Sequence, residues 1–369
     1  MEQFYHRFFD ALPIRSVASD EDLHLLNPQE LRLVRQTERW ALVAAVLIEL
    51  AAYLIIFMPI YEFPGIFDTA TVRLGGPFVT AGEFHWLRDG WMLLVTLIEL
   101  YVLLLLNLAA VHGISVATGY IRRDNKAGET GALIRIALES RFMELQQFGI
   151  DPFERMHPWV LFLYLAFNRL KGLLGSVIIR AVLANVFGRE MLRVYLDFSG
   201  MPLYMAINAY TTYAILRNAR VVVMGQTSIE IVRQQLPALT ATGWEAGLIY
   251  DTLQFIAVNK GDFHANHYHL SKAIIEHFSI ALEAAHALPP DYLDKLKTAR
   301  QPVADVCRLI IVLGFLLDGT LSRRERRQLA RLNQQGILRL DYAELEAYRR
   351  AFVDGQGLDG ITGHVLRSI

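Results

Sequence analysis

Two apolar stretches of this chain are long enough to cross a lipid bilayer, and each carries one acidic residue near its centre. Residues 40–58 contain Glu49 and residues 90–112 contain Glu99, both within the pattern Leu-Ile-Glu-Leu. About 20 apolar residues span the hydrocarbon core, and an ionised side chain at that depth costs a few kcal/mol or more. We therefore expect an integral membrane protein whose helices bury a polar seam inside a bundle.

Two further apolar runs, at residues 157–188 and 201–216, bring the predicted number of transmembrane helices to four. The first of these runs is too long for one crossing, so we interpret 158–168 as an interfacial or re-entrant piece and 172–188 as the span. Within 172–188 small residues recur at every fourth position around Arg180, which lets neighbouring helices approach closely. Glu49, Glu99 and Arg180 all fall near mid-span, so the sequence predicts an intramembrane charge network.

Three interpretations of this network stay open. Paired buried charges can fix the register of helices without any chemistry. They can also relay protons or ions, or one acid can reach up to the membrane interface instead of the bundle interior. Polar residues of the fourth run either line such a path or hydrogen-bond neighbouring helices. They are Tyr204, Asn208, Thr211 and Thr212.

Flanking charges predict the orientation of the spans. Basic residues gather before the first and third runs and after the second and fourth. By the positive-inside rule both termini then lie in the cytoplasm, and we expect a bacterial inner membrane as the location. Asn27, Pro28 and Glu30 form a helix start before the first span, and Pro59 and Pro64 are expected to end that helix. The first residues are polar and aromatic, so no cleavable signal peptide is expected.

The expected fold class is all-α, in three parts. They are a cytoplasmic N-terminal segment (1–39), a four-span membrane domain (40–225) with a cytoplasmic amphipathic helix at 129–148, and a cytoplasmic all-helical domain (226–369). The last part alternates apolar helical patterns with short polar breaks. The formal net charge of −1 argues against a nucleic-acid partner, and the single cysteine, Cys307, excludes an internal disulfide.

The C-terminal part contains a faint internal repeat. Residues 253–261 lead into a polar turn and a helix at 270–278, and residues 309–319 lead into a turn and a helix at 325–332. In the second copy Asp318 and Gly319 make the turn, Ser322 can cap the next helix, and Glu325 completes a capping box. Alternatively, Asp318 and Glu325 face each other across the turn and hold a hard cation such as Ca²⁺ or Mg²⁺.

The Asp318-Gly319 turn followed by Glu325 resembles the repeated element of TerB-like domains, the helical family named for tellurite resistance, over roughly residues 245–335. In that family paired acids are associated with divalent metal, so the resemblance implies a metal site at Asp318 and Glu325. The first copy departs from the pattern, because Lys260 stands in place of the turn acid and His267 in place of the helix acid. TerB-like domains are often accessory modules in membrane-associated systems.

Histidines replace acids in the first copy of the repeat. His264, His267 and His269 lie in its turn, and His277 lies one helix further. His264 and His267 are three residues apart and are candidate ligands for Zn²⁺ or Ni²⁺. The alternative is a solvated turn that binds no metal.

No enzyme is expected, because the chain has no phosphate loop, nucleophile elbow or zinc-protease motif. The sequence predicts a membrane-anchored scaffold or sensor whose helical domain recruits a cytoplasmic protein partner or responds to a divalent ion. The alternative is an ion channel or transporter with Glu49, Glu99 and Arg180 along its path. Four spans make a small pore for one chain, so a conducting form is expected to be a homo-oligomer. An enzyme acting on lipid is a third possibility.

Overall fold

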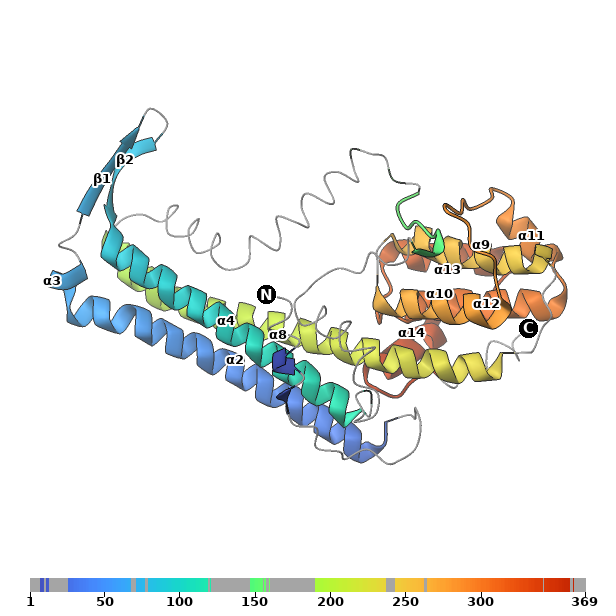
Figure 1. Ribbon diagram of the computed structural model, residues 1–369, viewed down its shortest axis with the longest axis horizontal. Helices are drawn as coiled ribbons and strands as arrows, with labels where there is room; N and C mark the ends of the chain where they lie inside the picture. The colour runs from blue at the N-terminus through green and yellow to red at the C-terminus, as the bar shows by residue number, and fades with distance from the viewer. Residues whose placement is uncertain are drawn as a thin grey trace. The chain divides into compact units, whose positions relative to one another are not determined.

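The computed structural model describes residues 7–9, 11–12, 26–67, 71–76, 79–118, 120, 147–154, 156, 159, 190–236, 243–261, 264–340, 342–358 and 361, with the backbone alone for 71–85 and 190–200. This part of the chain is predominantly helical (Figure 1). In chain order its main elements are α2 (Pro28–Glu62), α3 (Pro64–Phe67), β1 (Thr71–Gly76), β2 (Val79–His85), α4 (Trp86–Ala117), α8 (Glu190–Gln235), α9 (Gly243–Lys260), α10 (Ala265–Phe278), α11 (Tyr292–Thr298), α12 (Gln301–Leu316), α13 (Arg323–Gln334) and α14 (Tyr342–Val353).

The chain divides into two compact units. The apolar unit comprises Arg35–Val111 and Phe162–Leu216, and the C-terminal unit comprises Met1–Val34, His112–Leu161 and Arg217–Ile369. Helices α2, α4 and α8 each contribute one part to each unit. The division within α8 falls after Leu216, whereas the sequence predicts a domain boundary after residue 225.

Two of the described helices, α2 and α4, are long and apolar enough to cross a membrane. They contain the first and second predicted spans. The fourth predicted span lies within α8. Among the described residues, α8 does not meet the length and hydropathy criterion that α2 and α4 meet. The third span at 172–188, with Arg180, lies outside the described residues, as does nearly all of the helix expected at 129–148.

The predicted start of the first helix is confirmed. Asn27 Oδ1 accepts hydrogen bonds from the backbone N–H groups of Gln29 and Glu30, both at 2.9 Å. In return the Asn27 N–H donates to Glu30 Oε2 at 2.8 Å. This is a reciprocal capping box, and Pro28 takes the first helical position, where its missing N–H costs nothing.

The expectation that Pro59 ends the first helix is wrong, because α2 continues through Pro59 to Glu62. A proline inside a helix removes the hydrogen bond to the carbonyl four residues earlier, which here belongs to Ile55. The indole N–H of Trp91 in α4 donates to the Ile55 carbonyl at 3.1 Å. A neighbouring helix therefore supplies the missing donor, and α2 and α4 pack there through Ala52, Ile56 and Val95.

The sequence reasoning missed a β-hairpin in the segment between the first two spans. Strands β1 and β2 pair antiparallel, with Thr71 opposite His85 and Arg73 opposite Glu83. The register shifts between Leu74 and Gly76, which marks a β-bulge or a similar irregularity. The two short strands show only weak alternation of apolar and polar residues in the sequence, which is too little to predict a hairpin.

The C-terminal unit has its own hydrophobic core, with α9 and α12 packed against each other at its centre (Figure 1). Helix α12 is buried on nearly all sides, as expected for a helix that is apolar around its whole circumference. Gly314 on α12 permits the close approach, because a Cβ at this position would lie 2.5 Å from Ile256 of α9.

The C-terminal half of α8 belongs to this unit and packs on α10. The Asn266 side chain, at the start of α10, donates to the Val221 carbonyl of α8 at 2.9 Å and to the Leu317 carbonyl at 2.6 Å. Gly225 of α8 makes room for it, since a Cβ there would lie 2.0 Å from Asn266 Nδ2. A single buried amide therefore ties α8, α10 and the end of α12 together.

Candidate functional site

Burial in the apolar unit is inverted relative to a water-soluble protein. Glu49 is 2% exposed and Glu99 is 4% exposed, whereas their neighbours Leu47 and Ile98 are 56% and 54% exposed. Further exposed apolar residues lie along both helices, and contiguous surfaces of this kind mark membrane or protein contact. They include Trp40, Val43, Leu54, Ile55, Met58, Leu93, Leu94, Leu97, Tyr101 and Val102.

Glu49 of α2 and Glu99 of α4 meet on one side chain of α8. Asn208 Nδ2 donates a hydrogen bond to Glu49 Oε2, and a second one, at 3.1 Å, to Glu99 Oε1. An amide NH₂ has two hydrogens, so Asn208 can serve both carboxylates at once. The structure thus joins two of the three residues of the expected network through a polar residue of the fourth predicted span, while the part assigned to Arg180 stays a prediction.

In the C-terminal unit, Asp318 and Glu325 converge on the ammonium group of Lys260. Lys260 Nζ lies 2.7 Å from Asp318 Oδ2 and 3.3 Å from Glu325 Oε2. It also donates to the carbonyls of Phe315 at 3.0 Å and Thr320 at 3.2 Å. The Lys260 side chain is 2% exposed, so a buried ammonium with four oxygens around it stands where the TerB resemblance implies a metal ion.

Local interactions shape the turn that holds Asp318. Gly319 has a φ of +69°, which favours glycine, and the Thr320 N–H donates to Asp318 Oδ1 at 2.8 Å. Ser322 and Glu325 form the capping box of α13 that the sequence predicts. Burial alone would raise the pKa of Asp318, but the charge and hydrogen bond of Lys260, together with nearby His267 and His264, outweigh burial, and the pKa is lowered. The carboxylate therefore stays ionised opposite the ammonium.

The internal repeat explains why these groups meet. Gly261 and Gly319 both have positive φ, +62° and +69°, and His264 and Ser322 cap α10 and α13 at corresponding positions. Lys260 and Asp318 precede the two glycines, so the turn residues of the two copies pair with each other. The turn residues of the two copies are thus a cation and an acid, and their charges compensate each other.

The candidate histidine ligands are engaged in other contacts. His264 Nδ1 accepts from the Asn266 N–H at 3.2 Å, and its Nε2 lies 3.1 Å from Asn218 Oδ1 of α8. His267 is buried, and its Nε2 lies 2.8 Å from the Gly314 carbonyl. Burial lowers the pKa of His267 to about 4, so its ring is neutral. The interpretation of a solvated turn is therefore wrong for His267.

Metal binding at Asp318, Glu325, His264 and His267 stays a prediction. Across the described ranges, no three His, Cys, Asp or Glu side chains are grouped so that they could hold a metal ion. His264 and His267 have ring centroids 5.9 Å apart in an edge-to-face arrangement, and each Nε2 faces a different partner. Asp318 and Glu325 share Lys260 instead.

Two arginines that the sequence reasoning missed hold the turn from outside. Arg217 of α8 donates to the Gly319 carbonyl at 2.9 Å, and Arg349 of α14 donates to the same carbonyl at 3.0 Å. Arg349 is itself paired with Glu346 at 2.5 Å. The two contacts with Gly319 join residues at least 30 positions apart, and no local pattern in the sequence predicts them.

No family model, curated protein or solved structure matches this chain. The TerB resemblance accordingly rests on the turn and cap residues alone. The fold and the two polar centres define a helical protein that has two helices able to cross a membrane and a separate helical core in its C-terminal unit.

Proposed function

We propose that the chain is a membrane-anchored scaffold or sensor, with a four-span bundle and a cytoplasmic TerB-like helical module. The observation that carries the membrane assignment is the inverted burial in the apolar unit. Glu49 and Glu99 are buried on Asn208 while large apolar side chains face outward. This pattern suits lipid around the helices and a polar seam within them.

The sensor role is supported by the continuity of α8. This helix runs from Glu190 to Gln235 without a break. Its Asn208 contacts the two acids, and nine residues later its Arg217 donates to the Gly319 carbonyl beside the Lys260 centre. We infer that α8 is the element through which the sensor responds, because its side chains contact residues at both polar centres.

Between a protein partner and a divalent ion as the signal, the contacts of Lys260 favour the partner. Its ammonium already compensates Asp318 and Glu325, so the module holds its turns in place without a metal ion. A module stabilised in this way can present a fixed surface for recruitment. Membrane anchoring then confines the partner to the bilayer surface.

Two measurements on the full-length chain test this proposal. The protein should remain in the membrane after an alkaline carbonate wash, and cysteines introduced into residues 226–369 should be labelled only from the cytoplasmic side. Photo-crosslinkers placed on exposed positions of the C-terminal unit in intact cells should give one discrete, identifiable protein adduct. Release by carbonate would overturn the membrane assignment, and ion flux without any adduct would overturn the scaffold.

The second candidate function, an oligomeric ion channel or transporter, is favoured by the link between Glu49, Asn208 and Glu99. Carboxylates that share one amide inside a bundle can hand over a proton or bind a cation. Purified protein in proteoliposomes should then show ion flux that Glu49→Gln or Glu99→Gln abolishes. Unchanged flux together with a lower unfolding temperature would assign the two acids to structure instead.

A further inference from the structure

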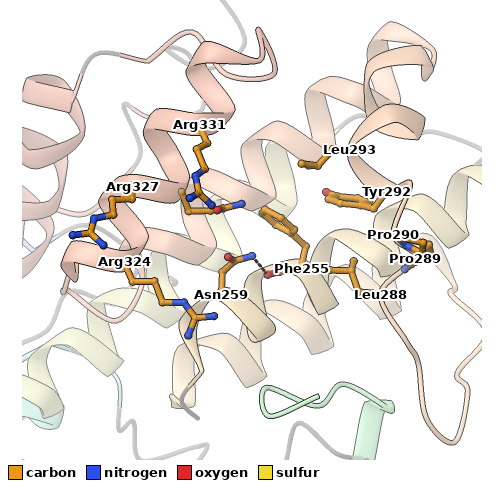
Figure 2. Close-up of a pocket in the computed structure, with 11 residues that line it drawn as sticks. Phe255, Asn259, Leu288, Pro289, Pro290, Tyr292, Leu293, Arg324, Arg327 and Arg331 are labelled. Atoms are coloured by element: carbon orange, nitrogen blue, oxygen red, sulfur yellow. Dashed lines mark hydrogen bonds between the residues drawn. The ribbon is translucent and has the colours of Figure 1, made fainter. Parts of the chain in front are cut away.

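A cavity of about 420 Å³ lies in the C-terminal unit beside α13 (Figure 2). One side of it is formed by arginines of α13, and the other by apolar residues of α9, α11 and the segment before α11. Its volume is within the range of small-molecule sites. The two sides differ in chemistry, and each selects for a different part of a ligand.

The charged side consists of Arg324, Arg327 and Arg331. Their spacing of three and four residues places them on one face of α13, and they cover about 10 Å along the helix axis. Arg324 donates to the Val258 carbonyl at 3.5 Å. Among the described residues, no carboxylate pairs with Arg327 or Arg331, and no acidic side chain lines the cavity. The guanidinium groups are therefore available to an anion.

The opposite side is apolar apart from Asn259, whose side-chain amide donates to the Phe255 carbonyl at 2.8 Å. Phe255 and Tyr292 are buried, with ring centroids 5.2 Å apart, and the Tyr292 hydroxyl donates to Thr252 at 2.9 Å. Leu288, Pro289, Pro290 and Leu293 complete this wall. Consecutive prolines restrict the backbone, so the wall keeps its shape when the cavity is empty. Such a surface accepts a flat or branched apolar group.

We propose that this cavity binds an organic phosphate, with its phosphate groups on the arginines and its apolar or aromatic part against the Phe255 side. Guanidinium groups bind phosphate through paired, charge-assisted hydrogen bonds. A row of them about 10 Å long matches several linked phosphates better than a single carboxylate. A nucleoside di- or triphosphate can contact both the arginines and the apolar wall. A phospholipid headgroup is the other source of an organic phosphate. The inference concerns a different site from the proposed scaffold function and does not depend on it.

Equilibrium binding to the full-length chain in detergent tests this assignment. The probes are ATP, ADP, inorganic pyrophosphate and a short-chain phosphatidic acid below its micellar concentration. We expect ATP or the short-chain lipid to bind with a Kd below about 1 mM and pyrophosphate to bind more weakly, because it cannot use the apolar wall. The stronger of the two organic ligands identifies the source.

Variants of α13 provide a matched comparison. Arg327→Gln combined with Arg331→Gln should weaken binding by at least about tenfold. Arg323→Gln removes one arginine charge from the same helix, at a position that does not line the cavity. This variant should therefore leave the Kd unchanged. Leu293→Asn should weaken ATP or lipid binding while sparing pyrophosphate. Unchanged unfolding temperatures show that each variant is folded.

Three results would overturn the inference. They are no binding of any organic phosphate at about 5 mM, equal losses in Arg323→Gln and the double variant, or pyrophosphate binding as tightly as ATP and the lipid. The second result would mean nonspecific attraction to a basic helix. The third would mean that the apolar wall takes no part.

Discussion

The ammonium of Lys260 lies 2.7 Å from Asp318 Oδ2, and the two residues occupy corresponding positions in the two copies of the internal repeat. Each stands immediately before a glycine with positive φ, at the end of α9 and just after α12. The packing of α9 on α12 brings these two turns together. The acids for which the TerB resemblance implies a metal ion, Asp318 and Glu325, therefore face a positive charge that the chain itself supplies.

Removing that charge should expose a latent metal site. Lys260→Ala leaves Asp318 and Glu325 buried without their cation, which should destabilise the C-terminal unit by about 3 kcal/mol. Added Ca²⁺ or Mg²⁺ can then fill the space between the carboxylates. Thermal unfolding of the full-length protein should show a lower melting temperature that Ca²⁺ partly restores.

The control for this prediction is Lys272→Ala, which removes an exposed lysine 4.0 Å from Glu276. Surface pairs contribute little, so this variant should unfold within a degree or two of the parent chain and ignore Ca²⁺. A melting temperature of the unaltered protein that rises with Ca²⁺ would contradict the idea that Lys260 replaces the metal.

The contact of α8 with α10 can be tested at Gly225. Gly225→Ala places a Cβ 2.0 Å from Asn266 Nδ2, and the amide cannot move without losing its bonds to Val221 and Leu317. We expect a loss of about 1–3 kcal/mol in unfolding free energy. Chemical denaturation followed by circular dichroism measures it.

Gly247→Ala is the matched control, because a Cβ at this position in α9 meets nothing within 4 Å. Replacing a helical glycine by alanine in open space should stabilise the unit by roughly 0.5–1 kcal/mol. If Gly225→Ala also stabilises the unit, backbone entropy rather than the Asn266 contact governs the effect at Gly225.

How much of this architecture follows from the sequence depends on how far apart the interacting residues are. Both capping boxes, Asn27 with Glu30 and Ser322 with Glu325, are confirmed. They could be predicted because each involves residues only three positions apart. The pairing of Lys260 with Asp318 and the bridging role of Asn208 depend on which helices pack together. Helical periodicity does not encode those neighbours. The passage of α2 through Pro59 was missed for the same reason, since the compensating donor comes from another helix.

Acid should destabilise the C-terminal unit through His267. In the unfolded chain this ring takes up a proton below about pH 6.5, whereas burial lowers its pKa to about 4 in the folded protein. The stability due to the neutral ring is therefore present above pH 6.5 and is lost as the pH falls towards 4. The loss amounts to about 3 kcal/mol. His267→Gln should flatten the dependence of unfolding free energy on pH in this window.

His286 should act in the opposite direction. Burial would lower its pKa, but hydrogen bonds with Asp251 at 2.8 Å and Glu283 at 2.9 Å outweigh it, and the pKa is raised. The protonated ring therefore stabilises the folded unit fully below about pH 6.5, and this contribution is lost as the pH rises through the folded-state pKa. His286→Gln should remove this alkaline loss. Unfolding curves of this variant from pH 6 to 9 measure the effect. If its unfolding free energy depends on pH as steeply as that of the parent chain, the His286 pairs contribute nothing.

The hydrogen bond from Trp91 to Ile55 predicts a coupling with Pro59. Trp91→Phe removes the indole donor and leaves the Ile55 carbonyl with neither a side-chain nor a helical partner, which should cost about 1–3 kcal/mol. Pro59→Ala restores a backbone N–H at position 59 that can donate to the same carbonyl. In the Pro59→Ala background, Trp91→Phe should therefore be less harmful by about 1 kcal/mol or more.

A double-mutant cycle of detergent-solubilised protein, followed by thermal unfolding, measures this coupling. Trp91→Phe keeps an aromatic ring at the contact with α2, so lost packing is a minor part of the difference. Additive effects of the two substitutions would mean that the Ile55 carbonyl finds another donor when the indole is removed. A positive coupling would mean that α2 passes through Pro59 because α4 supplies the donor that the proline lacks.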